Sequence, residues 1–485
     1  MANLVQLTVE GISHAQAGRI KEAEERFRLL VQLSPNPTAR ILLASLLPPI
    51  YQSMEDLRGW RQRLEQGIGE LVRQGVRHDV TESYAVPEFF AQYQGLDDKR
   101  LQESRAKLYS APQHSDWGRK RARAAGERIR VGIVSKYLRD HTIGRLAQGL
   151  VAQLPRGEFH LTLLSVAPGR DEVADFFKTH CDQFLPVPSS LPQARKMIAD
   201  LKLDVIYYLD LGMDPVTYTL ALSRLAPVQC ATWGHPVTSG ISAVDYFISA
   251  QGLEPDGSQG QFTEKLVTLK DLAVYYYRPV LEAPQAGVSA SADRFGLPAD
   301  ANLYGCPQSL YKFHPEFDAV LGGILRADAK GILVLLAAPY KEWMQALWQR
   351  FNRTMPDVLG RIRFIPRQDR QGFLRLNAAC DVLLDPLHFG GGNTTYEALA
   401  MGTPVITLPS GMLRGRLAFK MYQTIGLMDF VAKDAVDYVR LAAGLGMDRE
   451  RRRLAKEKIL AACPVLFENQ AGVAQLAEFW KSVVG

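Results

Sequence analysis

The chain has 485 residues, of which 47% are hydrophobic and 22% are charged. This balance is ordinary for a folded globular protein, and the length allows roughly three domains. The formal net charge is +6, and the basic residues are scattered except for one cluster between residues 119 and 130. A nucleic-acid-binding protein is therefore not indicated. We interpret the cluster as a solvated linker; contact with an acidic partner or a membrane surface is the alternative.

Cysteine usage and the first residues bear on the compartment. The five cysteines are odd in number and far apart, with no CxxC pair, which fits a reducing environment. The N-terminal residues lack the pattern of a secretory signal, and no run of about 18 apolar residues occurs. We therefore expect a cytoplasmic protein with no membrane span.

Residues 1–122 are predicted to form an all-helical domain, because they lack the alternation of a strand. Residues 15–35 have the pattern of one tetratricopeptide-like helix pair, with Gly18 at the turn, Phe27 between the helices and Pro35 after the second helix. No second copy follows at the expected spacing of about 34 residues, which favours a compact helical domain. Two further helices are expected, at 57–72 and 100–109.

Beyond this region, short apolar strands alternate with amphipathic helices, which predicts βαβ units and parallel sheets. We expect one Rossmann-like domain over 123–283 and a second over 284–485, with 275–292 crossing between them and the last helix, 470–484, a candidate to cross back. The strands expected in the first domain are 129–135, 161–166, 205–209, 228–233 and 246–249, and its helices are 144–154, 172–180, 192–201 and 216–225. In the second domain we expect strands 303–306, 332–336, 362–365, 382–384 and 405–408, with helices 315–325, 343–354, 373–379, 396–401 and 417–425.

Two doubly wound domains in series place their strand ends at a shared cleft, and a glycine-rich loop follows one late strand. Its sequence is DPLHFGGGNTTYEALAMG; Gly391 and Gly392 allow close backbone approach, and Asn393, Thr394 and Thr395 are expected to cap the next helix. Free N–H groups at a helix start suit phosphate. Glu397, on the first turn, is suited to accept hydrogen bonds from sugar or ribose hydroxyls. An ordinary glycine-rich turn is the alternative.

Three further residues follow strands that face the same cleft. Lys312, in CPQSLYKFHP, is placed to offset negative charge on a departing diphosphate; a surface lysine is the alternative. His141, in GIVSKYLRDH, is a candidate base or acceptor-orienting group, or else a capping histidine. His235, in WGHPVTSG, suggests a pyrophosphate or sugar contact, although a plain turn is favoured for this motif alone.

Short metal motifs are missing from the sequence. No D-x-D triplet occurs, and the nine histidines form no HxxxH or HExxH pair, so a divalent metal held by a local motif is not supported. There is no GxxxxGK[ST] either, which argues against phosphoryl transfer of the P-loop kind.

Four segments together resemble glycosyltransferase family 41, the group of O-GlcNAc transferase, SPINDLY and the bacterial adhesin N-glucosyltransferases. They are GIVSKYLRDH, APVQCATWGHPVTSG, QSLYK and GGGNTTYEALAMGTPVITLP, in this order, and the resemblance covers about 128–480. It implies a GT-B fold of two Rossmann-like domains, with the nucleotide sugar chiefly on the second. It also implies an inverting reaction that needs no metal or other cofactor. The tetratricopeptide-like piece agrees with it, and we expect that domain to bind the acceptor; a scaffold role is the alternative.

The resemblance assigns roles to individual residues. Lys312 matches the lysine that contacts the donor diphosphate, His141 matches the histidine near the acceptor, and Glu397 falls at or next to the acidic residue that holds the ribose. The diphosphate loop and its donor-side neighbours comprise Gly391, Gly392, Asn393, Thr394, Thr395, Gln308, Ser309, His235 and Pro236. The implied reaction is an in-line displacement in which a Ser/Thr hydroxyl or an Asn amide of a protein attacks the sugar C1. The general base stays open.

Some residues depart from the pattern of the animal O-GlcNAc transferases. Ser309 stands where those enzymes have glutamine, His235 where they have tyrosine, and Asn393 where they have histidine. The His235–Pro236 pair is closer to the N-glucosyltransferase branch, so a UDP-hexose is expected, with glucose and GlcNAc both open. Two alternatives remain: transfer to a glycan or small molecule, and a non-catalytic tetratricopeptide adaptor with a degenerate transferase body.

Overall fold

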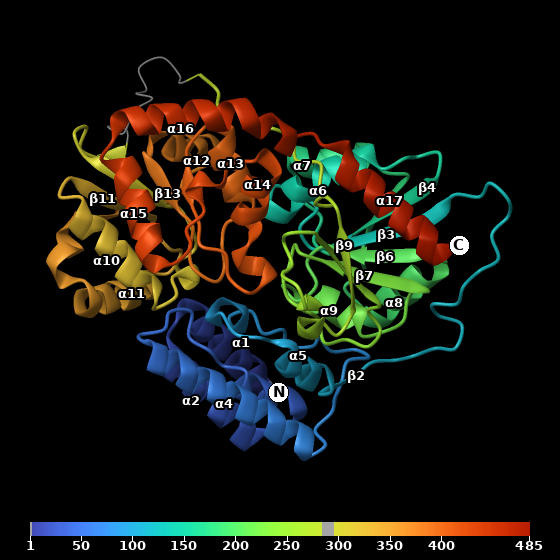
Figure 1. Cartoon of the computed structure of the whole chain (residues 1–485). Coiled ribbons are helices and arrows are strands. Elements are labelled where there is room, and N and C mark those ends of the chain that lie inside the picture. Colours follow the sequence, from blue (N-terminus) through green and yellow to red (C-terminus); the bar gives the residue numbers. More distant parts are fainter. Residues whose placement is uncertain (1, 284–294) are drawn as a thin grey trace.

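The computed structural model describes residues 2–283 and 295–485. Figure 1 shows a helical part (blue) lying beneath two α/β halves, one green and one orange. The predicted crossing segment 275–292 falls outside the described residues from position 284 onward. Among the helices that the structure describes, none is long and apolar enough to cross a membrane.

The helical part begins with a two-helix hairpin. Gly18 makes the turn with φ of +83°, as predicted, in the left-handed region that favours glycine. Phe27 is buried between the two helices against Gly11, where a Cβ atom would meet the ring at 2.4 Å. The helices are α1 (Ala2–Ala17), α2 (Ile20–Leu33), α3 (Pro37–Ala44), α4 (Met54–Arg73) and α5 (Lys99–Ala106). Two short parallel strands, β1 (His78–Asp79) and β2 (Tyr109–Ser110), were not predicted because two residues carry no alternation.

The helical part is docked on both α/β halves through buried arginines. Arg350 donates a hydrogen bond of 2.7 Å to the carbonyl of Tyr51, and Arg195 donates one of 2.8 Å to the carbonyl of Val80. Both guanidinium groups are fully buried, so each carbonyl is one of the few acceptors within reach.

The first α/β half is a seven-stranded parallel sheet in the order β5-β4-β3-β6-β7-β8-β9. All five predicted strands are present. Sequence reasoning missed the two outermost strands, β5 and β9, because nearly all of their residues are exposed or half-buried and they lack a continuous apolar run. The strands are β3 (Ile129–Ser135), β4 (Phe159–Ser165), β5 (Gln183–Pro186), β6 (Val205–Tyr208), β7 (Val228–Thr232), β8 (Tyr246–Ala250) and β9 (Lys265–Leu269). The helices are α6 (Thr142–Gln153), α7 (Glu172–Thr179), α8 (Leu191–Asp200) and α9 (Pro215–Ala221).

The second α/β half is a five-stranded parallel sheet in the order β12-β11-β10-β13-β14. The strands are β10 (Asn302–Cys306), β11 (Gly331–Leu336), β12 (Ile362–Ile365), β13 (Val382–Leu384) and β14 (Val405–Ile406). The helices are α10 (Phe317–Ala327), α11 (Lys341–Thr354), α12 (Arg370–Ala379), α13 (Asn393–Ala400), α14 (Leu417–Ile425), α15 (Ala435–Gly446) and α16 (Arg449–Ala462). Sequence reasoning missed α15 and α16, and β14 ends earlier than the predicted residue 408.

The last helix, α17 (Gln470–Val484), lies on the first α/β half, as Figure 1 shows in red. Its Trp480 is fully buried, with ring centroids 5.4 Å from Tyr207 and 6.0 Å from Phe159. At Gly472 a Cβ atom would lie 1.8 Å from the Leu272 carbonyl oxygen, so only glycine allows this approach. The core of the first half therefore includes residues from the end of the chain.

Candidate functional site

A cavity of about 1420 Å³ lies between the helical part and the two α/β halves. It is lined by the loops that follow β3, β7 and β10, by the glycine-rich loop and by the helical part. Ten of the twelve predicted site residues line it: His141, His235, Pro236, Gln308, Ser309, Lys312, Gly392, Asn393, Thr394 and Glu397. Segments far apart in the sequence thus meet at one place, where parallel strands end.

The glycine-rich loop is held by hydrogen bonds of its own. Asp385, at the end of β13, accepts hydrogen bonds from the Gly391 amide (2.7 Å) and the Thr407 hydroxyl (2.8 Å). The Thr395 hydroxyl donates to the Gly391 carbonyl at 2.8 Å. Gly391 and Thr395 do not line the cavity. In the structure these two residues shape the loop, and their contact with the donor stays a prediction.

Helix α13 begins at Asn393 with Gly392 as its N-cap and has no side-chain cap. The expectation that Asn393, Thr394 and Thr395 cap this helix is therefore wrong, since all three lie in its first turn. Within the described part of the chain, the amides of Gly392, Asn393 and Thr394 have no acceptor. Three unpaired N–H groups at the positive end of a helix suit an anion such as a phosphate.

Lys312 lies directly beside this loop. Its Nζ donates to the Gly390 carbonyl (2.9 Å) and to Gln308 Oε1 (2.8 Å), and it lies 4.8 Å from the centre of the Phe389 ring. Burial lowers the pKa of Lys312 to about 8, an effect that the Asp385 carboxylate opposes. Because its hydrogen-bond partners are neutral, the ammonium charge remains available to an anionic ligand.

His141 faces the cavity from the first α/β half. It is the N-cap of α6, and its Nδ1 accepts a hydrogen bond of 3.2 Å from the Ile143 amide. The ring stacks on Tyr137 with centroids 4.0 Å apart, and burial lowers the pKa of His141 to about 4. Assigned from this hydrogen bond, the neutral ring carries its proton on Nε2. In this arrangement the Nε2–H of His141 is a hydrogen-bond donor group, while Nδ1 is occupied by the Ile143 amide.

Glu397 lies where the two α/β halves meet. Its carboxylate is 3.7 Å from Arg145 on α6, and burial raises the pKa of Glu397 to about 7, an effect that Arg145 and Arg370 oppose. Nearby, the Asn393 side chain donates to the Thr142 carbonyl at 3.0 Å. Both residues therefore contact the opposite half as well as the cavity.

The remaining predicted residues differ in their surroundings. His235 is buried, and this burial lowers its pKa to about 3, so its ring is neutral at pH 7. Gly212, with φ of +107°, passes so close that a Cβ atom would lie 2.6 Å from the His235 ring. Ser309 is exposed at the cavity wall.

Sequence reasoning did not single out several cavity residues. Lys136 forms an ion pair of 2.7 Å with Asp214. Phe89, Phe90 and Tyr311 form an aromatic wall, with Tyr311 centred 5.8 Å from Phe89 and 5.9 Å from Phe90. Tyr311 precedes Lys312 in the QSLYK motif and was within reach of that reasoning, whereas the two phenylalanines lie in an irregular segment without periodicity.

One group of metal-ligand side chains occurs among the described residues. Ligand atoms of His314, Glu316 and His388 lie within 4.8 Å of one another. His388 Nε2 and Glu316 Oε2 already form a hydrogen bond of 2.8 Å, and Glu316 is exposed. None of the three lines the cavity, so an ion held there would not touch a ligand bound in it.

Comparison with known proteins finds similarity to glycosyltransferases. Residues 280–475, which include Lys312 and the glycine-rich loop, match the model of Glycosyl transferase family 41. A probable UDP-N-acetylglucosamine–peptide N-acetylglucosaminyltransferase SPINDLY of Petunia hybrida is 24% identical over 403 residues, covering 77% of this chain and 41% of the relative. A relative named SEC from Arabidopsis thaliana, with the same probable activity, is 23% identical over 361 residues, covering 72% and 36%. The chain thus spans about two-fifths of the length of these relatives.

A solved structure covers the whole chain. A mutant O-GlcNAc transferase from Thermobaculum terrenum matches with a TM-score of 0.69 and 21% identity, covering 100% of this chain and 98% of that one. This likeness shows that the fold of the two α/β halves, with the helical part before them, is the expected GT-B arrangement. The sequence match to glycosyltransferase family 41 covers residues 280–475, which include most of the second α/β half.

Proposed function

We propose that the protein is an inverting, metal-independent glycosyltransferase. It moves a hexose, glucose or GlcNAc, from a UDP-sugar to a protein side chain, either a Ser/Thr hydroxyl or an Asn amide. The observation that carries this proposal is the position of Lys312, whose ammonium is bonded to Gly390 of the loop that leads to the three unpaired amides at the start of α13. The relatives are named as probable UDP-N-acetylglucosamine–peptide N-acetylglucosaminyltransferases, which supports the same donor and acceptor classes.

In the proposed reaction, negative charge develops on the departing nucleoside diphosphate. The acceptor atom forms a bond to the sugar C1 while the bond from C1 to the phosphate oxygen breaks. The electron pair leaves with the nucleoside diphosphate, and the acceptor proton passes to the departing phosphate or to water. Lys312 and the amides of Gly392, Asn393 and Thr394 stabilise that negative charge more strongly than they stabilise the ground state. These groups replace the divalent ion that such a leaving group would otherwise need.

The residues around this centre take supporting roles. His141 presents its Nε2–H to the reacting groups and orients them. Glu397 accepts hydrogen bonds from the ribose when it is ionised. The aromatic wall of Phe89, Phe90 and Tyr311 borders the acceptor end of the cavity. Because the helical part supplies two of these rings, we assign acceptor binding to it.

The test combines a donor panel with one variant. The protein is incubated with UDP- and GDP-sugars and a cell lysate, and mass shifts are measured on intact proteins and peptides. We expect a hexose or N-acetylhexosamine shift with one UDP-sugar, and a loss of about 10²-fold in rate for Lys312→Ala. Lys330→Ala, an exposed lysine of the same half, is the matched control. Consumption of the UDP-sugar without a mass shift on any protein or peptide would contradict the protein acceptor. No transfer and no nucleotide binding would favour an adaptor.

A further inference from the structure

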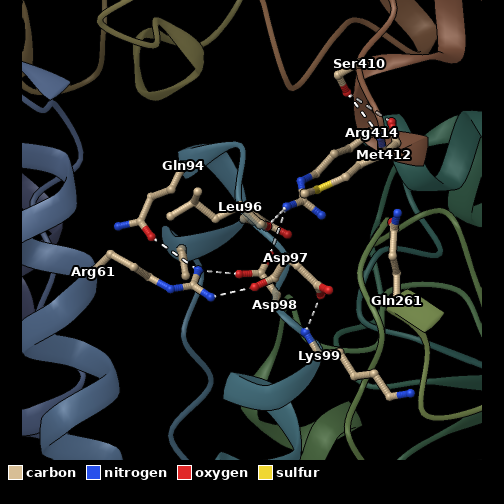
Figure 2. Close-up of polar contacts among 12 residues, drawn as sticks. Arg61, Gln94, Leu96, Asp97, Asp98, Lys99, Gln261, Ser410, Met412 and Arg414 are labelled. Atoms are coloured by element: carbon tan, nitrogen blue, oxygen red, sulfur yellow. Dashed lines mark hydrogen bonds and ion pairs between the residues drawn. The ribbon is translucent and has the colours of Figure 1, made fainter. Parts of the chain in front are cut away.

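A buried charge cluster joins the helical part to the second α/β half. Figure 2 shows Asp98 between two arginines, Arg61 on α4 and Arg414 in the segment after β14. Asp98 Oδ1 pairs with Arg61 Nη1 at 2.6 Å, and Asp98 Oδ2 pairs with Arg414 Nη2 at 3.0 Å. Arg414 also donates to the Leu96 carbonyl, and Arg61 donates to the Asp97 carbonyl at 2.7 Å.

The cluster is shielded from water. The side chains of Arg61, Asp98 and Arg414 are 6%, 1% and 5% exposed. In such a place Asp98 offsets both guanidinium groups, and its loss would leave Arg414 buried without its counter-ion and Arg61 with only the half-exposed Glu65. A buried ion pair of this kind fixes the relative position of the two segments that it joins, because its charged groups cannot exchange one another for water.

The backbone of Arg414 leads directly to the glycine-rich loop. Its carbonyl accepts a hydrogen bond of 2.8 Å from the Gly390 amide. The Gly390 carbonyl in turn accepts the hydrogen bond from Lys312 Nζ. At the next residue, Gly415, a Cβ atom would lie 3.1 Å from the His388 carbonyl, so this segment packs tightly on the loop. One residue, Gly390, therefore connects the backbone of Arg414 to the proposed catalytic lysine.

We propose that Asp98 and Arg414 are positioning residues: through them the helical part holds the glycine-rich loop, and with it Lys312, in the donor-binding arrangement. This inference rests on the proposed function, since it concerns the same site. It gives the helical part a second role, apart from acceptor binding, in forming the donor site. Neither residue lines the cavity, so neither touches the donor.

The main test reads the loop itself. Hydrogen–deuterium exchange is measured on the full chain for Asp98→Asn, for the milder Arg414→Lys, and for Glu65→Gln as the matched control. Glu65 pairs with the same Arg61 but is 53% exposed and does not touch Arg414. We expect peptides covering 386–392 to exchange about tenfold faster in the first two variants than in wild type, with β3 unchanged. Unchanged exchange at 386–392 in folded Arg414→Lys and Asp98→Asn protein would overturn the proposal.

A second measurement separates this inference from the proposed function. UDP affinity is measured by calorimetry for the same proteins, together with their melting temperatures. We expect Asp98→Asn to bind UDP about tenfold more weakly, while Glu65→Gln binds as wild type does. Equal UDP affinity in wild type and Asp98→Asn would overturn the positioning role. If wild type itself fails to bind UDP, the proposed function fails, and the exchange at 386–392 still decides whether the ion pair holds the loop.

Discussion

Each α/β half has one strand that leads through a loop to a helix start at the cavity, and the two helix starts differ. After β3, the start of helix α6 has a side-chain cap and is called closed here, because the His141 ring accepts a hydrogen bond from the Ile143 amide. After β13, the start of helix α13 is open, because Gly392 has no side chain to accept an amide. The same strand–loop–helix unit therefore gives a closed terminus that presents an imidazole in one half and an open terminus suited to an anion in the other.

Closing the open terminus should have the largest effect. Gly392→Asp places a carboxylate at the N-cap of α13, where it accepts the free amides and repels a diphosphate. We expect UDP binding to weaken by about 10²-fold or more, measured by calorimetry. Gly392→Ala is the control, since φ is −91° and the nearest atom to an added Cβ lies at 3.6 Å. Equal losses in both variants would show that shape, not charge, governs this position.

The charge beside the open terminus should depend on pH. With burial holding the pKa of Lys312 at about 8, its ammonium is charged below that pH and neutral above it. We expect kcat/KM for the donor to fall with rising pH above about 8, approaching tenfold per pH unit. Lys312→Arg keeps its charge throughout this range and should abolish the fall, whatever its absolute rate. If kcat/KM still falls above pH 8 in Lys312→Arg, another titrating group causes the fall.

Removing the His141 cap from the start of α6 should have smaller effects than the two changes above. His141→Ala removes the cap of α6 and should lower the free energy of unfolding by about 1 kcal/mol, whereas His141→Asn keeps a capping oxygen. Both variants lose the Nε2–H donor, so we expect both to transfer sugar roughly tenfold more slowly. Denaturant unfolding and initial rates check this pair. If His141→Asn transfers sugar at the wild-type rate, the role of His141 is limited to capping α6.

The smallest effect is expected from a chelator. Because Lys312 and the backbone amides are proposed to replace a divalent ion, EDTA should leave the transfer rate within about twofold of its untreated value. The rate is measured before and after dialysis against EDTA, with Mg²⁺ added back. Loss of activity that Mg²⁺ restores would contradict the metal-independent mechanism.

Sequence reasoning located the strands that are buried on both faces and the loops that follow them. Strand β13 and the glycine run after it carry a local pattern that a reader of the sequence can see. The hydrogen bonds within the loop carry no such pattern, because tertiary geometry decides whether the Gly391 amide donates to a phosphate or to Asp385. For the same reason, the charged residues Asp98 and Arg414 read as surface residues, although the fold buries them 316 positions apart.

The position of α17 has a consequence for biosynthesis. The first α/β half is made early on the ribosome, yet its core lacks Trp480 until the last helix has been synthesised. Until then the face that receives α17 exposes apolar side chains, including Phe159 and Tyr207, to the surrounding solution. In a chain that ends before residue 470, the first α/β half would lack part of its core, although the truncation lies far away in the sequence. Such a chain would be a natural substrate for chaperones.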